Sequence, residues 1–204
     1  MPTELTEAFI EGRLQKAYRP EMKATTDGYV EVQDGMPLKC AAVLIALVWW
    51  KEEWQLVFTR RTETVEHHKG QVSFPGGGCE VHETTPEETA LREAEEEIGL
   101  RRGDIRILGR MNDVATVTGF RIMPVIGVMK WPFEYKLEPA EVVRVFVIPI
   151  TWLADRNNWD ERPFTVDGLP RSFPVIIYHP YDGEVLWGAS ARITHNFLNV
   201  LGIL

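Results

Sequence analysis

The chain alternates between short apolar runs and polar stretches, and this pattern predicts both helices and strands. Residues 4–18 carry apolar side chains about four positions apart among charged ones, which predicts an amphipathic helix closed by Pro20. The apolar runs at 41–50 and 54–61 flank a short charged turn and predict two consecutive strands. Residues 62–78 are rich in His, Gly and Thr, and we expect them to form mostly loop.

The rest of the chain continues as an irregular mixture of the two element types. Two adjacent strands before a central helix favour an α/β fold with a mixed sheet between helices, not a regular βαβ winding. We expect a helix and a connecting segment over 1–37, with a short strand at Tyr29–Val32, and a domain over 38–204. Further strands are predicted at 105–108, 120–128, 142–148, 175–178 and 185–187, and further helices at 86–98 and 189–201.

Composition narrows the function classes. A net charge of −8 over 204 residues argues against a nucleic-acid partner, because binding a phosphate backbone needs a basic surface. The longest apolar run, Cys40 to Trp50, has 11 residues, against about 20 for a membrane-spanning helix, so we expect no membrane segment. No secretory signal is recognisable at the start. Cys40 and Cys79 form no disulfide framework, and we expect a reducing, cytoplasmic setting.

An unusually acidic helix is predicted at 86–98. Thr85 is a typical N-cap, Pro86 suits the first helical position, Glu88 completes a capping box and Gly99 marks the end. Six glutamates lie between these signals, accompanied by one basic residue, Arg92.

Three of these glutamates form a candidate metal site. Glu93, Glu96 and Glu97 are spaced i, i+3 and i+4 and therefore share one stripe of the helix, beside an apolar stripe that would seat it on a core. Carboxylates so close together repel one another unless a cation binds them. Hard oxygen ligands favour Mg²⁺ or Mn²⁺, which polarise phosphoryl oxygens and lower the pKa of a bound water. The alternative is a solvated acidic helix face without a ligand.

The residues ahead of the helix favour the metal site. Glycines 76–78 allow close backbone approach, and the stretch 77–100, GGCEVHETTPEETALREAEEEIGL, resembles the Nudix signature G-x5-E-x7-R-E-U-x-E-E-x-G-U, in which U is aliphatic. Gly77, Glu83 and the block from Arg92 to Leu100 match. Eight residues instead of seven separate Glu83 from Arg92, and Ala94 occupies the first aliphatic position.

The resemblance to the Nudix family implies an α/β/α sandwich and a pyrophosphohydrolase activity with a divalent metal. It implies that Glu93, Glu96 and Glu97 hold the metal, joined by a backbone carbonyl near Gly77, and that Arg92 orients these carboxylates. Glu141, just before the strand at 142–148, is a candidate general base, because the family often has a returning glutamate there. A surface glutamate at a strand start is the alternative.

Upstream, residues 56–77 resemble the stretch typical of coenzyme A pyrophosphatases, L-L-T-x-R-[SA]-x3-R-x3-G-x3-F-P-G-G. Positions 59, 61, 70 and 74–77 match, whereas Glu66 stands where an arginine is expected. This resemblance implies cleavage of coenzyme A or its thioesters into adenosine 3′,5′-bisphosphate and a 4′-phosphopantetheine product. Arg60, Arg61 and Lys69 are the cations we expect to bind the substrate phosphates, unless they are ordinary surface charges.

Two alternatives stay open at this point. Glu66 reverses a charge in the substrate motif, which favours another nucleoside diphosphate derivative, such as ADP-ribose or a dinucleoside polyphosphate. The other alternative is a ligand-binding regulator without catalysis. The three metal carboxylates argue against it, because such a regulator need not retain them. In each case the partner is a small molecule, with homodimer formation left open.

Overall fold

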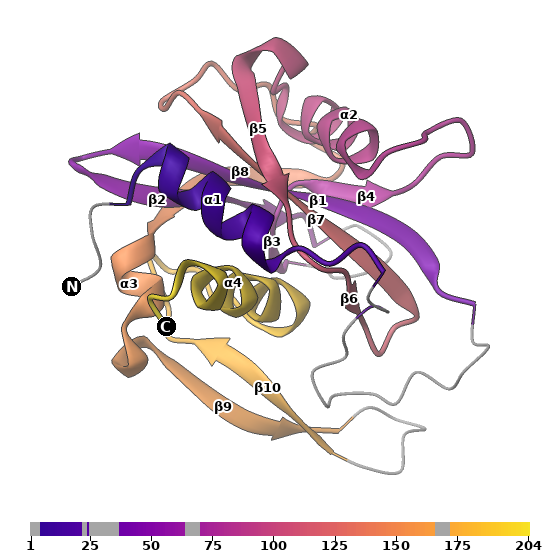
Figure 1. Ribbon diagram of the computed structural model, residues 1–204. Coiled ribbons are helices and arrows are strands. Elements are labelled where there is room, and N and C mark those ends of the chain that lie inside the picture. Colours follow the sequence, from indigo (N-terminus) through magenta and orange to yellow (C-terminus); the bar gives the residue numbers. More distant parts are fainter. Residues whose placement is uncertain (1–4, 22–23, 25–36, 64–69, 166–171) are drawn as a thin grey trace.

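The computed structural model describes residues 5–21, 24, 37–63, 70–165 and 172–204. In this part of the chain an eight-stranded mixed sheet has the order β3-β2-β1-β7-β5, while β4, β6 and β8 pair with β1, β7 and β2 (Figure 1). Only β1 and β7 are parallel among these pairs. The sheet strands are β1 Lys39–Trp50, β2 Glu53–Arg61, β3 Val72–Ser73, β4 Gly76–Gly78, β5 Ile105–Arg110, β6 Val114–Ala115, β7 Phe120–Met129 and β8 Val142–Pro149.

A separate two-stranded sheet, short helical turns and four α-helices complete the described structure. The second sheet consists of β9 Trp159–Phe164 and β10 Phe173–Tyr178, which pair antiparallel. The α-helices are α1 Glu7–Ala17, α2 Pro86–Ile98, α3 Ile150–Ala154 and α4 Gly188–Leu201, and the 3₁₀ turns are η1 Arg102–Asp104 and η2 Arg156–Asn158.

The main sheet separates two hydrophobic cores, and the central strand β1 contributes to both. Leu44 and Ala46 face the core under α2, whereas Ile45 and Leu47 face the core under α1 and α4. Burial on both faces explains why β1 is almost continuously apolar, since a half-exposed strand would alternate with polar residues. The expected α/β/α sandwich with a mixed sheet is therefore confirmed.

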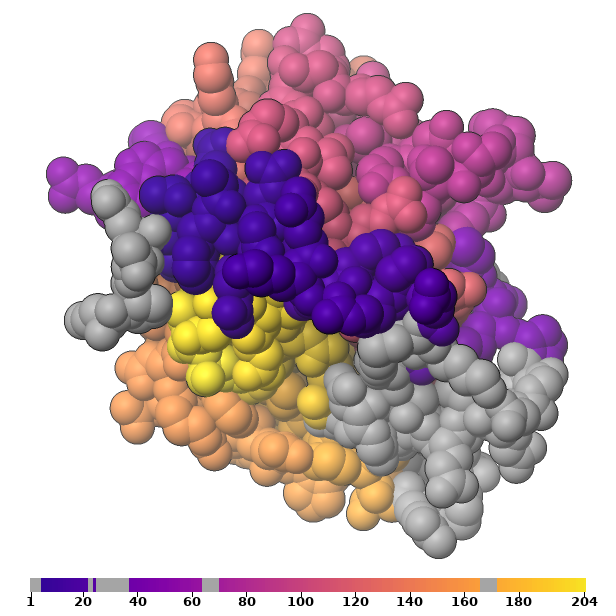
Figure 2. Space-filling view, viewed as in Figure 1, coloured from indigo at the N-terminus to yellow at the C-terminus, as the bar shows by residue number. Residues whose placement is uncertain are grey.

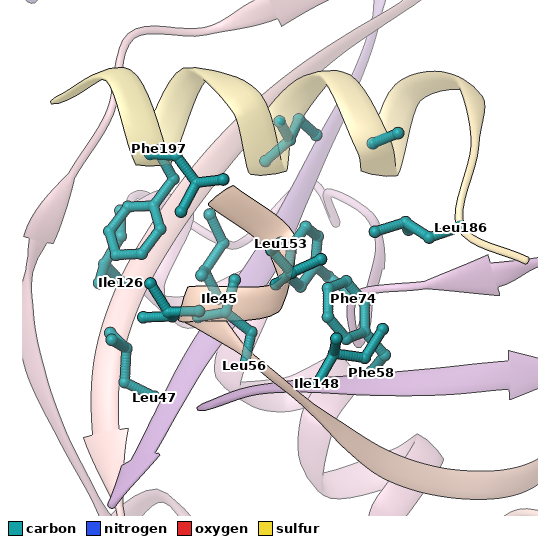
Figure 3. Packing of buried hydrophobic residues seen from close by; sticks show 14 of the residues in the cluster. Ile45, Leu47, Leu56, Phe58, Phe74, Ile126, Ile148, Leu153, Leu186 and Phe197 are labelled. Carbon is teal, nitrogen blue, oxygen red and sulfur yellow. The ribbon is translucent and has the colours of Figure 1, made fainter. Parts of the chain in front are cut away.

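Helices α1 and α4 lie side by side over one face of the sheet (Figure 1). In the space-filling view, the indigo N-terminal and yellow C-terminal parts of the chain lie against each other (Figure 2). The buried Ile10 and Leu14 of α1 belong to the same core as Phe197 of α4, and Arg13 Nε donates a hydrogen bond of 2.6 Å to the Val200 carbonyl. Figure 3 shows aromatic and aliphatic side chains of the sheet packed beneath α4. The first helix thus packs on the main core, while the division of the chain at residue 37 stays a prediction.

Most predicted elements are confirmed, and the exceptions have physical reasons. The helices at 4–18, 86–98 and 189–201 and the strands at 41–50, 54–61, 105–108, 120–128, 142–148 and 175–178 appear with small shifts at their ends. Strand β9 was missed because its sequence, WDERPF, is polar and largely exposed. The expected strand at 185–187 is wrong: only Trp187 forms an isolated bridge, to Ile177. The strand expected at Tyr29–Val32 lies outside the described residues.

The expectation for the cysteines is corrected, because Cys40 and Cys79 form a disulfide with a Cα–Cα distance of 5.4 Å. Strand β4 pairs antiparallel with β1 and places Gly78 opposite Ala41, so the next residues outward, Cys79 and Cys40, face each other. This register depends on tertiary pairing and has no signal in the cysteine spacing. No helix in the described residues is long and apolar enough to cross a membrane.

Candidate active site

The acidic helix α2 is fixed at both ends by the signals expected from its sequence. Thr85 and Glu88 form the reciprocal capping box, Pro86 begins the helix, and Gly99 ends it in the left-handed conformation with a φ of 73°. Ala90, Ala94 and Ile98 are fully buried against the sheet. This seating fixes the rotation of α2 about its axis and directs Glu93 and Glu97 toward strand β4.

Two glycines of strand β4 lie in close contact with neighbouring elements, Gly76 with the backbone of β1 and Gly77 with the Glu93 side chain of α2. A Cβ at Gly76, where φ is 154°, would lie 2.4 Å from the Ala42 carbonyl oxygen. A Cβ at Gly77 would lie 2.6 Å from Oε1 of Glu93. The backbone of β4 is therefore in direct reach of the helix carboxylates.

Glu97 is the most deeply buried carboxylate of the stripe, with 2 % of the residue exposed. Its Oε2 accepts a hydrogen bond of 3.2 Å from the Gly76 N–H, and its Oε1 lies 3.1 Å from Nη1 of Arg61. Burial raises the pKa of Glu97 to about 7, although Arg61 and the Gly76 N–H act in the opposite direction. A carboxylate that is so poorly solvated gains strongly from a bound cation.

Glu93 and Glu96 are engaged by Arg92 from the same helix. Nη1 of Arg92 lies 2.9 Å from a carboxylate oxygen of each, and its Nη2 donates to the Gly78 carbonyl at 2.8 Å. The side chain of Glu93 is 16 % exposed, and burial raises its pKa. The side chain of Glu96 is 59 % exposed, so the three carboxylates form a gradient from buried to open.

Glu83 is integrated into the site despite the extra residue that separates it from Arg92. Its Oε1 accepts a hydrogen bond of 2.8 Å from Arg92 Nε, and its Oε2 accepts from Thr89 and from the Glu80 N–H, each at 2.7 Å. Burial opposes ionisation, but these hydrogen bonds lower the pKa of Glu83 to about 2. The loop between β4 and α2 thus absorbs the extra residue, and Glu83 anchors Arg92.

Arg61 and Glu141 complete the arrangement from the other side. Arg61 ends β2, and its Nη2 lies 3.4 Å from Oε2 of Glu141, the residue before β8. Since Nη1 of Arg61 also contacts Glu97, the candidate base is joined to the buried carboxylate through one guanidinium. The sequence grouped Arg61 with substrate-binding cations and gave no sign of these carboxylate contacts.

Of the other two predicted cations, Arg60 does not join this cluster. Arg60 contacts Glu184 at 3.5 Å and Glu63 at 3.4 Å. The residue paired with it on β8, Arg144, also contacts Glu184, at 3.2 Å. Successive residues of a strand point to opposite faces of the sheet, which separates Arg60 from Arg61. Lys69 lies outside the described residues.

The donor chemistry suits a hard divalent cation. The carboxylates of Glu93 and Glu97 lie beside the β4 backbone, whose Gly77 carbonyl is the third oxygen donor expected there. Among the described residues, no three acidic, histidine or cysteine side chains enclose a common point. Two arginines, Arg61 and Arg92, instead hold the carboxylates of the stripe.

Comparisons of sequence and structure relate this chain to known proteins. A NUDIX domain model matches residues 39–168. A protein of Yersinia enterocolitica named uncharacterized Nudix hydrolase NudL is 36% identical over 163 residues, which cover 80% of this chain and 82% of that protein. Its namesake in Photorhabdus laumondii is 29% identical over 155 residues, 76% and 81% of the two chains. The crystal structure of DR0079 from Deinococcus radiodurans covers 81% of this chain and 88% of its own, with a TM-score of 0.50 and 14% identity, a likeness of fold alone.

Proposed function

This chain belongs to the Nudix family of pyrophosphohydrolases, and we propose that it hydrolyses coenzyme A or its thioesters with Mg²⁺ or Mn²⁺. The products would be adenosine 3′,5′-bisphosphate and a 4′-phosphopantetheine compound. The observation that carries this proposal is the resemblance of residues 56–77 to the coenzyme A pyrophosphatase motif. This stretch includes β2 and β4, and β4 lies directly beside α2.

Motif residues contribute to the site in different ways. Arg61 contacts Glu97 and Glu141, and Gly76 donates its N–H to Glu97. Thr59 is fully buried and its hydroxyl donates to the Ser73 carbonyl at 3.2 Å, which ties β2 to β3. Phe74 stacks on Phe58 with ring centroids 4.6 Å apart. Some motif residues therefore pack the core beneath the site, and others provide its polar contacts.

Divalent metal is the cofactor typical of the family, and this donor set fits Mg²⁺ or Mn²⁺. We assign Glu93, Glu96, Glu97 and the Gly77 carbonyl to hold it. The bound ion would neutralise the diphosphate and lower the pKa of a water. Arg92, fixed by Glu83, orients Glu93 and Glu96, and Glu141 is our candidate for the group that accepts the proton of the attacking water.

A second substrate class follows from Glu66, a position outside the described residues. Its negative charge replaces the arginine of the coenzyme A motif and favours a nucleoside diphosphate derivative without the 3′-phosphate. ADP-ribose and dinucleoside polyphosphates are such compounds. The non-catalytic alternative is disfavoured, because the chain retains Arg92 and all three carboxylates of the stripe.

A substrate panel tests this proposal. We expect coenzyme A and acetyl-coenzyme A to give a kcat/KM about tenfold or more above that of ADP-ribose or diadenosine tetraphosphate, which corresponds to about 1.4 kcal/mol of transition-state discrimination. Products are separated by chromatography in MgCl₂ or MnCl₂, with EDTA as the metal-free control. Equal or better turnover of ADP-ribose would overturn the coenzyme A assignment. An absence of turnover on all four compounds would favour a ligand-binding regulator.

A further inference from the structure

Arg61 occupies a central position between two carboxylates that come from distant parts of the chain. Its Nη1 lies 3.1 Å from Oε1 of Glu97 on α2, and its Nη2 lies 3.4 Å from Oε2 of Glu141 before β8. The Arg61 side chain is 22 % exposed, Glu97 is 2 % exposed, and Glu141 is 46 % exposed. One guanidinium therefore connects the buried carboxylate to the open side of the site.

The contacts of Glu97 determine where a metal ion can reach it. Its Oε2 is held by the Gly76 N–H, a backbone group that cannot leave without breaking the pairing of β4 with β1. Its Oε1 is held by Arg61, a long side chain that can move. A cation that takes Oε1 of Glu97 as its ligand would therefore displace Arg61 and take over the charge that Arg61 supplies.

The same contacts argue against a primary role of Arg61 in substrate binding. A guanidinium binds phosphate best through two parallel N–H donors, and here each of the two terminal nitrogens of Arg61 faces a carboxylate. Leaving the buried Glu97 without a positive partner would be strongly unfavourable, because a buried charge that loses its counter-ion keeps its full desolvation penalty.

We propose that Arg61 is a positioning residue of the metal centre, an inference that rests on the proposed metal site. Before the metal binds, its guanidinium is the counter-ion of Glu97. When the metal takes over that charge, the other arm of Arg61 continues to hold Glu141 in place. Arg61 thus prepares Glu97 for the metal and fixes the candidate base, without contacting the substrate.

Thermal unfolding with and without MnCl₂ tests the first role. In EDTA we expect Arg61→Gln to lower the Tm by about 5 °C or more. Saturating MnCl₂ should reduce this difference to less than half, because the metal replaces the missing charge and stabilises the variant more than the wild type. Arg61→Lys retains a positive charge and should recover part of the Tm in EDTA. It also serves as the test variant if Arg61→Gln does not fold.

Arg60→Gln is the matched control, since the neighbouring arginine contacts Glu184 and Glu63 instead of the site carboxylates. Its Tm difference from the wild type should be the same in EDTA and in MnCl₂. The role of Arg61 would be overturned if MnCl₂ stabilises the wild type but leaves the Tm difference between the wild type and Arg61→Gln unchanged. That result would leave the metal site intact. A wild type that MnCl₂ does not stabilise would overturn both.

Kinetics in saturating MnCl₂ test the second role, on whichever substrate of the panel is turned over best. For Arg61→Gln we expect kcat to fall about tenfold or more with KM changed less than about twofold, the pattern of a lost interaction that acts on the chemical step. A rise in KM with kcat unchanged would show that Arg61 binds substrate, and would refute its assignment as a positioning residue.

Discussion

At the scale of single residues, the site depends on unequal burial of similar side chains. Glu93, Glu96 and Glu97 are identical in chemistry and adjacent on one stripe, yet the exposed fraction of their side chains rises from 2 % at Glu97 to 16 % at Glu93 and 59 % at Glu96. Poor solvation makes a carboxylate more dependent on a cation. Glu97 should therefore be the member of the stripe least replaceable by a neutral residue.

Replacing Glu97 with glutamine tests whether its buried carboxylate is required for turnover. The amide has the same shape but cannot supply a charged ligand, so we expect turnover to fall by about three orders of magnitude, roughly 4 kcal/mol of transition-state stabilisation. Folding should survive, as judged by circular dichroism. Glu95→Gln, on the exposed side of the same helix, is the control and should keep near wild-type turnover. Wild-type turnover in the Glu97 variant would refute its role as a metal ligand.

At the scale of elements, the glycine strand β4 is held in place by more than its short pairing with β1. It has three residues, and the disulfide between Cys40 and Cys79 connects the two strands directly beyond their paired residues. The Cys79 N–H also donates to the Cys40 carbonyl at 3.1 Å. The disulfide closes a loop across 39 positions of sequence and helps to hold β4 against the carboxylates of α2.

Reduction of this disulfide should lower stability. Opening a loop of this length restores conformational freedom to the unfolded chain, and we expect the free energy of unfolding to fall by about 2–4 kcal/mol. Urea denaturation with and without dithiothreitol measures the change, after thiol titration has established that the bond is formed. A Cys40→Ser, Cys79→Ser double variant should be insensitive to the reductant. Equal midpoints for the wild type under both conditions would contradict the expected stabilisation.

At the scale of the whole molecule, the buried His195 packs α4 against the β9–β10 sheet. Its ring makes edge contacts with Trp159 and Tyr178, with centroids 4.3 and 5.6 Å apart, and its Nε2 has no hydrogen-bond partner in the described part of the chain. Burial, with a smaller effect of Arg192 and Arg156, lowers the pKa of His195 to about 4. The folded protein therefore resists protonating this ring.

The pH dependence of stability follows from this shift. Between pH 4 and the unfolded value of 6.5, the unfolded state binds more protons at this histidine, so stability rises with pH by up to about 1.4 kcal/mol per unit and is fully present above 6.5. The raised pKa of Glu97 has the opposite effect, because it lowers the free energy of unfolding as the pH rises toward 7. Comparing the wild type with His195→Leu isolates the histidine, because Glu97 is present in both.

Urea denaturation across this pH range is the measurement. We expect the free energy of unfolding of the wild type to rise relative to that of His195→Leu as the pH rises from 4 to 6.5. A difference independent of pH would mean that His195 is protonated equally in the folded and unfolded states.

The sequence by itself determined the elements and the chemistry whose signals are local. The capping box and the terminal glycine gave α2 its observed limits, and the spacing of Glu93, Glu96 and Glu97 placed them on one stripe. Alternating and continuous apolar runs predicted the long strands, because burial of one or both faces leaves a periodic pattern. Local rules therefore sufficed for the helix, the carboxylate stripe and most of the sheet.

Only the tertiary structure decided the contacts that join distant segments. The pairing of β4 with β1 brought Cys40 to Cys79, and the meeting of β2, α2 and the start of β8 brought Arg61 between Glu97 and Glu141. Strand register and helix seating are set by the packing of the two cores as a whole, and no single segment encodes them. For the same reason Arg60 and Arg61, alike and adjacent in sequence, belong to opposite faces of the sheet and to different sets of contacts.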